Sequence, residues 1–65
     1  MLELGEPSNV RMTYSEAMMY CFSLGPGWRL PTRDELAKNR FSFVGYWYKD
    51  KNTSLKWELI PVRDI

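Results

Sequence analysis

The sequence predicts a small α+β domain in which two short helices pack on a small antiparallel sheet. Two observations support this class. The motif Thr-x-x-Glu occurs twice, at Thr13–Glu16 and Thr32–Glu35, and apolar residues at helical spacing follow it each time. From Phe41 onward the pattern changes to a period of two, which is typical of strands. The length of 65 residues allows one domain.

The first helix is predicted to run from about Tyr14 to Leu24. The Thr13 hydroxyl can accept a hydrogen bond from the Glu16 N–H while the Glu16 side chain reaches back, which makes a capping box. Gly25 stands where a helix C-terminal glycine is favoured, and the proline after it prevents continuation. The apolar stripe of this helix consists of Ala17, Cys21 and Leu24, with Tyr14 and Met18 beside them.

The conspicuous segment Gly27–Thr32 is interpreted as structural. Its Trp28 and Leu30 are expected to fill the core, and Thr32 is expected to cap a second helix that ends near Lys38. The segment therefore sets the two helices against the rest of the domain.

The strands are predicted from alternation. Short strands are expected at Leu2–Leu4 and Asn9–Met12, and a hairpin is expected between Phe41–Tyr48 and Leu55–Ile60, with the polar turn at 49–54.

The hairpin register follows from its apolar faces. Pairing Trp47 with Trp57 buries the apolar face, which includes Phe43 and Leu55, whereas a slip by one residue would expose half of it. On the outer face, which also includes Ile60, this register places Tyr48 opposite Lys56 and Tyr46 opposite Glu58.

Composition excludes several classes of function. The chain has no histidine and one cysteine, so no zinc site and no Ser-His or Cys-His pair can be assembled. We therefore expect no enzyme activity, no metal and no cofactor. Cys21 is interpreted as a buried thiol in a reducing compartment. The N-terminus does not resemble a signal peptide, and apolar runs are too short to span a membrane, so a cytoplasmic protein without a membrane partner is predicted.

A resemblance to a bacterial and phage signature rests on Thr13–Cys21, Leu24, Gly27–Thr32 and Glu35–Leu36. These residues resemble the helix–GWRLPT–helix core of the DUF1566 family, whose members are similar to C-type-lectin-like and formylglycine-generating-enzyme-like domains. The resemblance implies a much shortened core of that fold, closed by a strand at Pro61–Arg63, in a small phage or mobile-element protein. The calcium-binding motifs and paired catalytic cysteines of those families have no counterpart here.

The predicted function is a small protein-binding module, which acts on a host protein or on a second copy of itself. Its partner-binding residues are expected on the outer face of the hairpin, where tyrosines stand among charges, together with an arginine in the Gly27–Thr32 segment. That arginine could instead pair with Glu16 or Glu35. The candidate residues are Tyr46, Tyr48, Lys56, Glu58 and Arg29.

The alternative is a nucleic-acid-binding module. Residues 28–65 hold eight basic and five acidic residues, and aromatic side chains near cations can form a stacking platform. The residues for this role would be Arg40, Lys49, Lys51 and Lys56, with the same tyrosines. The net charge of +1 makes this the weaker hypothesis. Small size also predicts a homodimer or a partner-stabilised state, joined at an exposed sheet edge.

Overall fold

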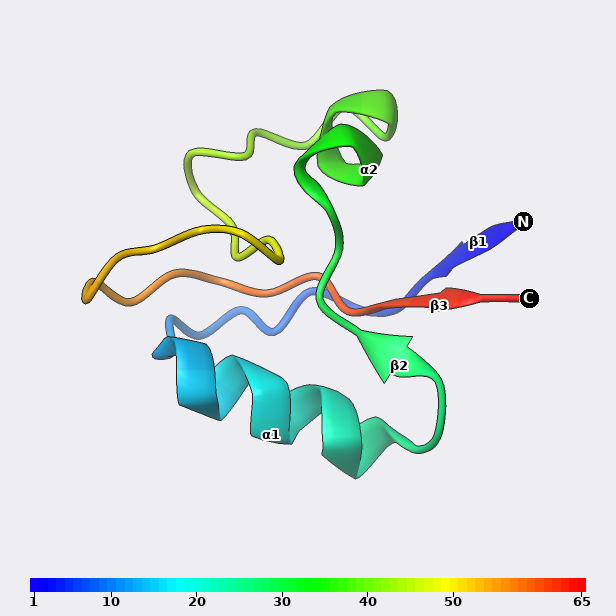
Figure 1. The fold of residues 1–65 in the computed structure, drawn as a ribbon, viewed down its shortest axis with the longest axis horizontal. Helices are drawn as coiled ribbons and strands as arrows, with labels where there is room; N and C mark the ends of the chain where they lie inside the picture. The colour runs from blue at the N-terminus through cyan, green and yellow to red at the C-terminus, as the bar shows by residue number, and fades with distance from the viewer.

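Two helices and a three-stranded antiparallel sheet form the regular structure, which confirms the predicted α+β class. The computed structural model describes residues 1–65, the whole chain. In the view of Figure 1, α1 and α2 lie on opposite sides of the strands, and the two chain ends lie side by side. The elements in chain order are β1 (Leu2–Leu4), α1 (Tyr14–Leu24), β2 (Trp28–Arg29), α2 (Arg33–Lys38) and β3 (Val62–Asp64).

Both helices begin at the capping boxes that the sequence predicts. At α1, the Thr13 hydroxyl accepts from the Glu16 N–H at 3.2 Å, and the Glu16 carboxylate accepts from the Thr13 N–H at 2.8 Å. Thr32 and Glu35 repeat this exchange at α2, at 3.1 and 2.8 Å. Helix α1 ends at Gly25, whose φ of +119° favours glycine. Local sequence therefore fixes both helix starts.

The sheet has β3 in its centre, with β1 on one side and β2 on the other. The strand predicted at Leu2–Leu4 is confirmed as β1, and the closing strand is confirmed as β3. The strand predicted at Asn9–Met12 is wrong, because only Met12 forms a bridge, to Trp57.

The C-terminal segment pairs with the N-terminal segment over most of its length. Beyond the β1–β3 ladder, the Ser8 N–H donates to the Leu59 carbonyl at 2.8 Å. Further along, Met12 and Trp57 exchange backbone hydrogen bonds of 2.9 and 3.0 Å. Residues 8–12 thus pair with the segment that the predicted hairpin assigns to residues 41–48.

The predicted hairpin is accordingly wrong. Residues 41–48 and 55–60 form no ladder, and their one bridge, Tyr46 with Glu58, is parallel. Leu55, expected in the core, is 61% exposed, and Ile60, expected on the outer face, is 1% exposed. Lys51 explains part of the difference, because its ammonium binds three carbonyls from residues 43–46 at 2.9–3.1 Å. Successive carbonyls of a strand point to opposite sides, so this convergence curls the chain.

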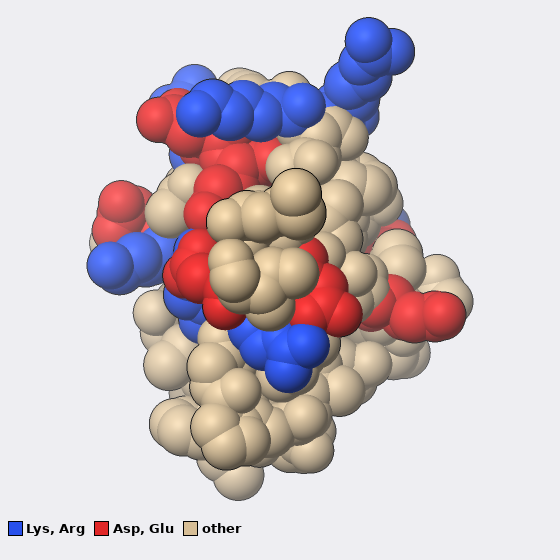
Figure 2. All heavy atoms as spheres, turned by 90° about the vertical axis from the view of Figure 1, so that its right-hand side faces the viewer, with Lys and Arg blue, Asp and Glu red and all other residues tan.

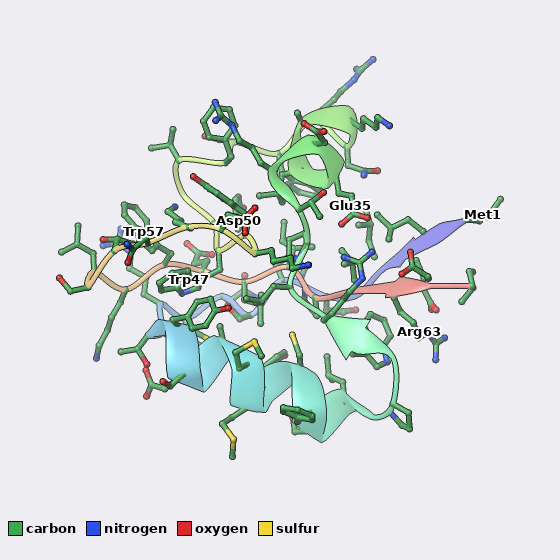
Figure 3. The ribbon with its side chains drawn as sticks, viewed as in Figure 1. Met1, Glu35, Trp47, Asp50, Trp57 and Arg63 are labelled. Carbon is green, nitrogen blue, oxygen red and sulfur yellow. The ribbon has the colours of Figure 1, made fainter.

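The hydrophobic core lies between α1 and the extended C-terminal segment. Trp47 is fully buried there, and its indole N–H donates to the Met12 carbonyl at 2.6 Å (Figure 3). Phe43, expected in this core, is only half-buried and lies under the Arg33 guanidinium, which is 4.2 Å from the ring centre. The buried cluster consists of Met12, Ala17, Cys21, Leu30, Trp47 and Leu59.

Candidate functional site

The Arg29 guanidinium is held by carboxylates and a carbonyl of the domain, and its side chain remains 36% exposed. Its guanidinium forms a two-point contact with Glu35, with both N···O distances at 2.9 Å, and reaches Asp64 at 3.1 Å. It also donates to the carbonyl of Leu30. Of the two internal pairings considered for Arg29, the one with Glu35 is observed and the one with Glu16 is not, and this arginine joins β2, α2 and β3.

Arg29, Glu35 and Asp64 form what we call the Arg29 cluster. Their contacts shift the pKa values of Arg29 and Glu35. The Arg29 hydrogen bonds lower the pKa of Glu35 to about 2, with the Thr32 cap adding to the effect and burial opposing it. The same contacts raise the pKa of Arg29 above its ordinary value. Both groups are charged at neutral pH, and their charges neutralise each other. Arg29 thus has little capacity left for an external anion.

The predicted outer face of the hairpin does not form as one surface. Tyr46 is half-buried with its ring edge-to-face on Phe41, at a centroid distance of 5.7 Å, and Glu58 is its bridge partner. Tyr48 is half-buried against Phe43 at 6.4 Å. Lys56 is exposed but does not stand opposite Tyr48. Of these four residues, Tyr46 and Glu58 lie together as bridge partners, whereas Tyr48 and Lys56 do not face each other.

Lys51 acts as a structural cation. Besides its three carbonyl contacts, its ammonium lies 3.8 Å from the ring centre of Trp57 and 5.5 Å from that of Tyr48. Burial lowers the pKa of Lys51 from its ordinary value. The Lys51 ammonium is already bound by these carbonyls. The cations still available to bind nucleic acid, under the alternative hypothesis, are therefore Arg40, Lys49 and Lys56.

We expect Lys51→Met to destabilise the protein by about 1–3 kcal/mol, because three carbonyls lose a charged donor while the apolar stem remains. Urea unfolding followed by tryptophan fluorescence measures this change. The matched variant Lys49→Met removes the same charge from a side chain without an ion pair, and it should change stability by less than about 0.5 kcal/mol. Equal effects of the two variants would contradict the role assigned to Lys51.

The outer side of α1 carries an apolar patch. Met18, Met19 and Phe22 are 38%, 68% and 74% exposed, and Phe22 lies four and three residues from the two methionines, which makes it a neighbour of both on the helix. We call these three residues the α1 face. Glu16 is the one charged residue of the helix. In Figure 2 the lower part of the molecule, where α1 ends, shows no charged atoms, whereas charges gather over the strands and α2.

Three adjoining hollows, which together we call the α1 trench, lie beside this face, and neighbouring hollows share lining residues. Its middle part has a volume of about 280 Å³. A hollow of about 70 Å³ continues it through Met18 and Leu30, and one of about 320 Å³ continues it through Tyr14 and Lys49. The middle part is lined by Tyr14, Met18, Arg29, Leu30, Thr32 and Lys49.

The two ends of the trench differ in polarity. One end is formed by Cys21, Phe22 and Trp28, and burial raises the pKa of the Cys21 thiol to about 11, so it is neutral at neutral pH. The other end is formed by the polar residues 49–53. Lys49 belongs to the middle and to the polar end, and it forms no ion pair within the chain.

Neither the α1 face nor the trench was predicted. A signal for the face exists in the sequence, because no charged residue occurs between Glu16 and Arg29. A surface helix normally has charged or polar residues on its outer side. The trench has no such signal, since it depends on where residues 28–32 and 49–53 lie relative to α1.

Comparison with known proteins gave no match to a family model, to a curated protein or to a solved structure. The resemblance of residues 13–36 to the DUF1566 and C-type-lectin-like families therefore stays a prediction. No helix of the protein is long and apolar enough to cross a membrane. Its cysteine and carboxylate side chains form no group of three or more that could hold a metal ion.

Proposed function

We propose that this protein is a non-enzymatic protein-binding module whose contact surface is the α1 face with the trench beside it. The observation that supports this most is the exposure of Met18, Met19 and Phe22 as neighbours on a helix with one charged residue. Methionine and aromatic residues are enriched at the centres of protein interfaces, while lysine and glutamate are depleted there. Methionine side chains also adapt to the shape of a partner.

The size of the molecule suits this role. Its accessible surface is 4610 Å², so a standard interface of about 800 Å² per partner would cover about a sixth of it. The α1 face alone is smaller than that, and the trench supplies the additional area. The single buried thiol of Cys21 supports a location in the reducing cytoplasm.

The proposal moves the contact surface away from the predicted tyrosines and keeps Arg29 only in the wall of the trench. Arg29 is saturated by internal carboxylates, and Tyr46 and Tyr48 are half-buried against phenylalanines. Lys56 and Glu58 remain candidates for the rim of an interface, where side chains contribute little energy. The partner is a host protein or a second copy, and the phage-type accessory role remains part of this proposal.

Site-specific photo-crosslinking tests the proposal. A benzophenone amino acid is placed at position 22, on the α1 face, and in a matched variant at position 44, because Val44 is also exposed, at 64%, but lies outside α1. We expect one discrete protein adduct from position 22 and none from position 44 in cells that express the chain. An adduct with a second copy would identify self-association.

Two results would contradict the proposal: equal labelling from both positions, or no adduct from position 22 in any cell fraction. A discrete adduct alone is not sufficient support. The crosslinked protein, once purified, must also bind the unmodified chain in solution.

A further inference from the structure

The polarity of the α1 trench indicates what kind of partner segment fits it. The apolar end, with Phe22 and Trp28, suits an apolar side chain. At the polar end, Lys49 presents an ammonium that no carboxylate of the chain neutralises within 4 Å. A peptide segment that carried apolar side chains at one end and a carboxylate at the other would match both.

The other charges of the trench support this assignment. The Arg29 guanidinium in its wall is neutralised by Glu35 and Asp64. The polar end contains one acidic residue, Asp50, against Lys49 and Lys51. The ammonium of Lys51 is held by backbone carbonyls and still adds positive charge. The polar end therefore has a net positive charge, and Lys49 is its free donor.

The length of the trench sets the spacing in the partner. Phe22 and Tyr14 are eight helical residues apart, which corresponds to about 12 Å along α1. An extended chain covers this distance in about four residues. The two recognition features of the partner should be separated by about that number.

We propose that the α1 trench binds an extended segment of a partner protein that carries apolar side chains and, about four residues away, an aspartate or glutamate. Lys49 binds the carboxylate, and the end near Phe22 takes the apolar side chains. This inference rests on the proposed protein-binding function and specifies the partner of the same surface. Opposite charges at an interface contribute specificity and register, and a wrong charge at Lys49 repels.

Selection from a library of random linear peptides displayed on phage tests the inference. The full chain is immobilised as the wild type and as the variants Lys49→Glu, Lys38→Glu and Phe22→Lys. Lys38→Glu makes the same change of charge on α2, outside the trench. Circular dichroism checks that every variant is folded before selection.

We expect the wild type to enrich peptides with the apolar and acidic residues at this spacing. Synthetic copies, capped at both ends, should bind Lys49→Glu at least about tenfold more weakly than wild type, and Lys38→Glu as tightly. Phe22→Lys should lose the same peptides. Replacement of the peptide acid by its amide should reproduce the loss on wild type and have no effect on Lys49→Glu.

Other outcomes separate this inference from the function on which it rests. Enriched peptides without an acid, which bind Lys49→Glu normally but not Phe22→Lys, would overturn the inference and leave the α1 face as the contact surface. Failure to enrich any peptide, or binding that neither Phe22→Lys nor Lys49→Glu changes, would overturn both. A labelled single-stranded oligonucleotide that loses affinity equally on Lys49→Glu and Lys38→Glu would point to nucleic acid instead.

Discussion

Trp47→Ala is expected to leave the protein largely unfolded at 25 °C. The Trp47 side chain is completely buried, and its ring packs edge-to-face on Tyr14 at a centroid distance of 5.5 Å. Truncation of a buried tryptophan costs about 3–5 kcal/mol. A single core in a chain of 65 residues supplies about 3–5 kcal/mol, so the loss approaches the whole of it. Far-UV circular dichroism and urea unfolding measure the result.

A milder substitution separates the volume of Trp47 from its hydrogen bond. Trp47→Phe keeps an aromatic ring but removes the indole N–H that donates to the Met12 carbonyl. That carbonyl still accepts from the Trp57 N–H, so it is not left unpaired. We expect this variant to fold with a loss of about 1–3 kcal/mol. A Trp47→Ala protein that unfolds at the wild-type urea concentration would contradict the position of Trp47 at the centre of the core.

Glu35→Gln is expected to lower stability at neutral pH and to flatten its dependence on acid. The Arg29 contacts lower the pKa of Glu35 from 4.5 to about 2 in the folded protein. A lowered folded-state pKa stabilises the fold above about pH 4.5, and this contribution disappears as the pH falls toward 2. Because the Arg29 side chain is 36% exposed and solvent screens the pair, we expect about 1–2 kcal/mol.

The variants and pH range isolate this ion pair. Glutamine retains an oxygen for the Thr32 N–H, so the helix cap persists and the charge alone is lost. Asp34→Asn removes the neighbouring charge in the same helix turn without touching Arg29. Thermal unfolding between pH 7 and 2 should show a shallower acid limb for Glu35→Gln than for Asp34→Asn. Parallel curves for these two variants would contradict the account of the Arg29 cluster.

Some acid dependence will remain in Glu35→Gln. Glu16 accepts the hydrogen bond from the Thr13 backbone at the start of α1, and this bond, with the Thr13 hydroxyl, lowers the pKa of Glu16. Its carboxylate is exposed, so the contribution is small.

The helices could be predicted from sequence because their signals are local. Each Thr-x-x-Glu box fixes a helix start within four residues, and Gly25 marks the end of α1. No distant contact is needed to form these features, and the structure has both helices where they were expected.

The hairpin could not be predicted because a period of two identifies faces and does not identify partners. Trp57 has the alternation of a strand, yet it pairs with Met12, 45 positions away in the sequence, instead of with Trp47. Two kinds of contact decide the arrangement: Lys51 binds carbonyls five to eight positions before it, and the distant N-terminal segment pairs with the C-terminal segment. The turn-forming composition of residues 49–54 is compatible both with the predicted hairpin and with the observed structure.

In the candidate site, too, features near one helix start could be predicted and contacts between distant segments could not. The sequence placed Glu35 among the possible partners of Arg29, because both stand near one helix start. The α1 trench was beyond prediction, since Lys49 reaches it only when its backbone N–H binds the Pro31 carbonyl, at 2.9 Å. That contact joins two segments whose relation no local pattern encodes.

The affinity of the crosslinked partner for two matched double variants tests the central claim most directly. Met19→Lys with Phe22→Lys changes the α1 face, and Val44→Lys with Leu55→Lys makes the same change at two residues of similar exposure elsewhere. Isothermal titration calorimetry should show binding weakened at least about thirtyfold by the first pair and unchanged by the second, with both proteins as stable as wild type to within about 1 kcal/mol. Unchanged binding by the α1 variant, or equal losses in both, would contradict the claim that α1 is the contact surface.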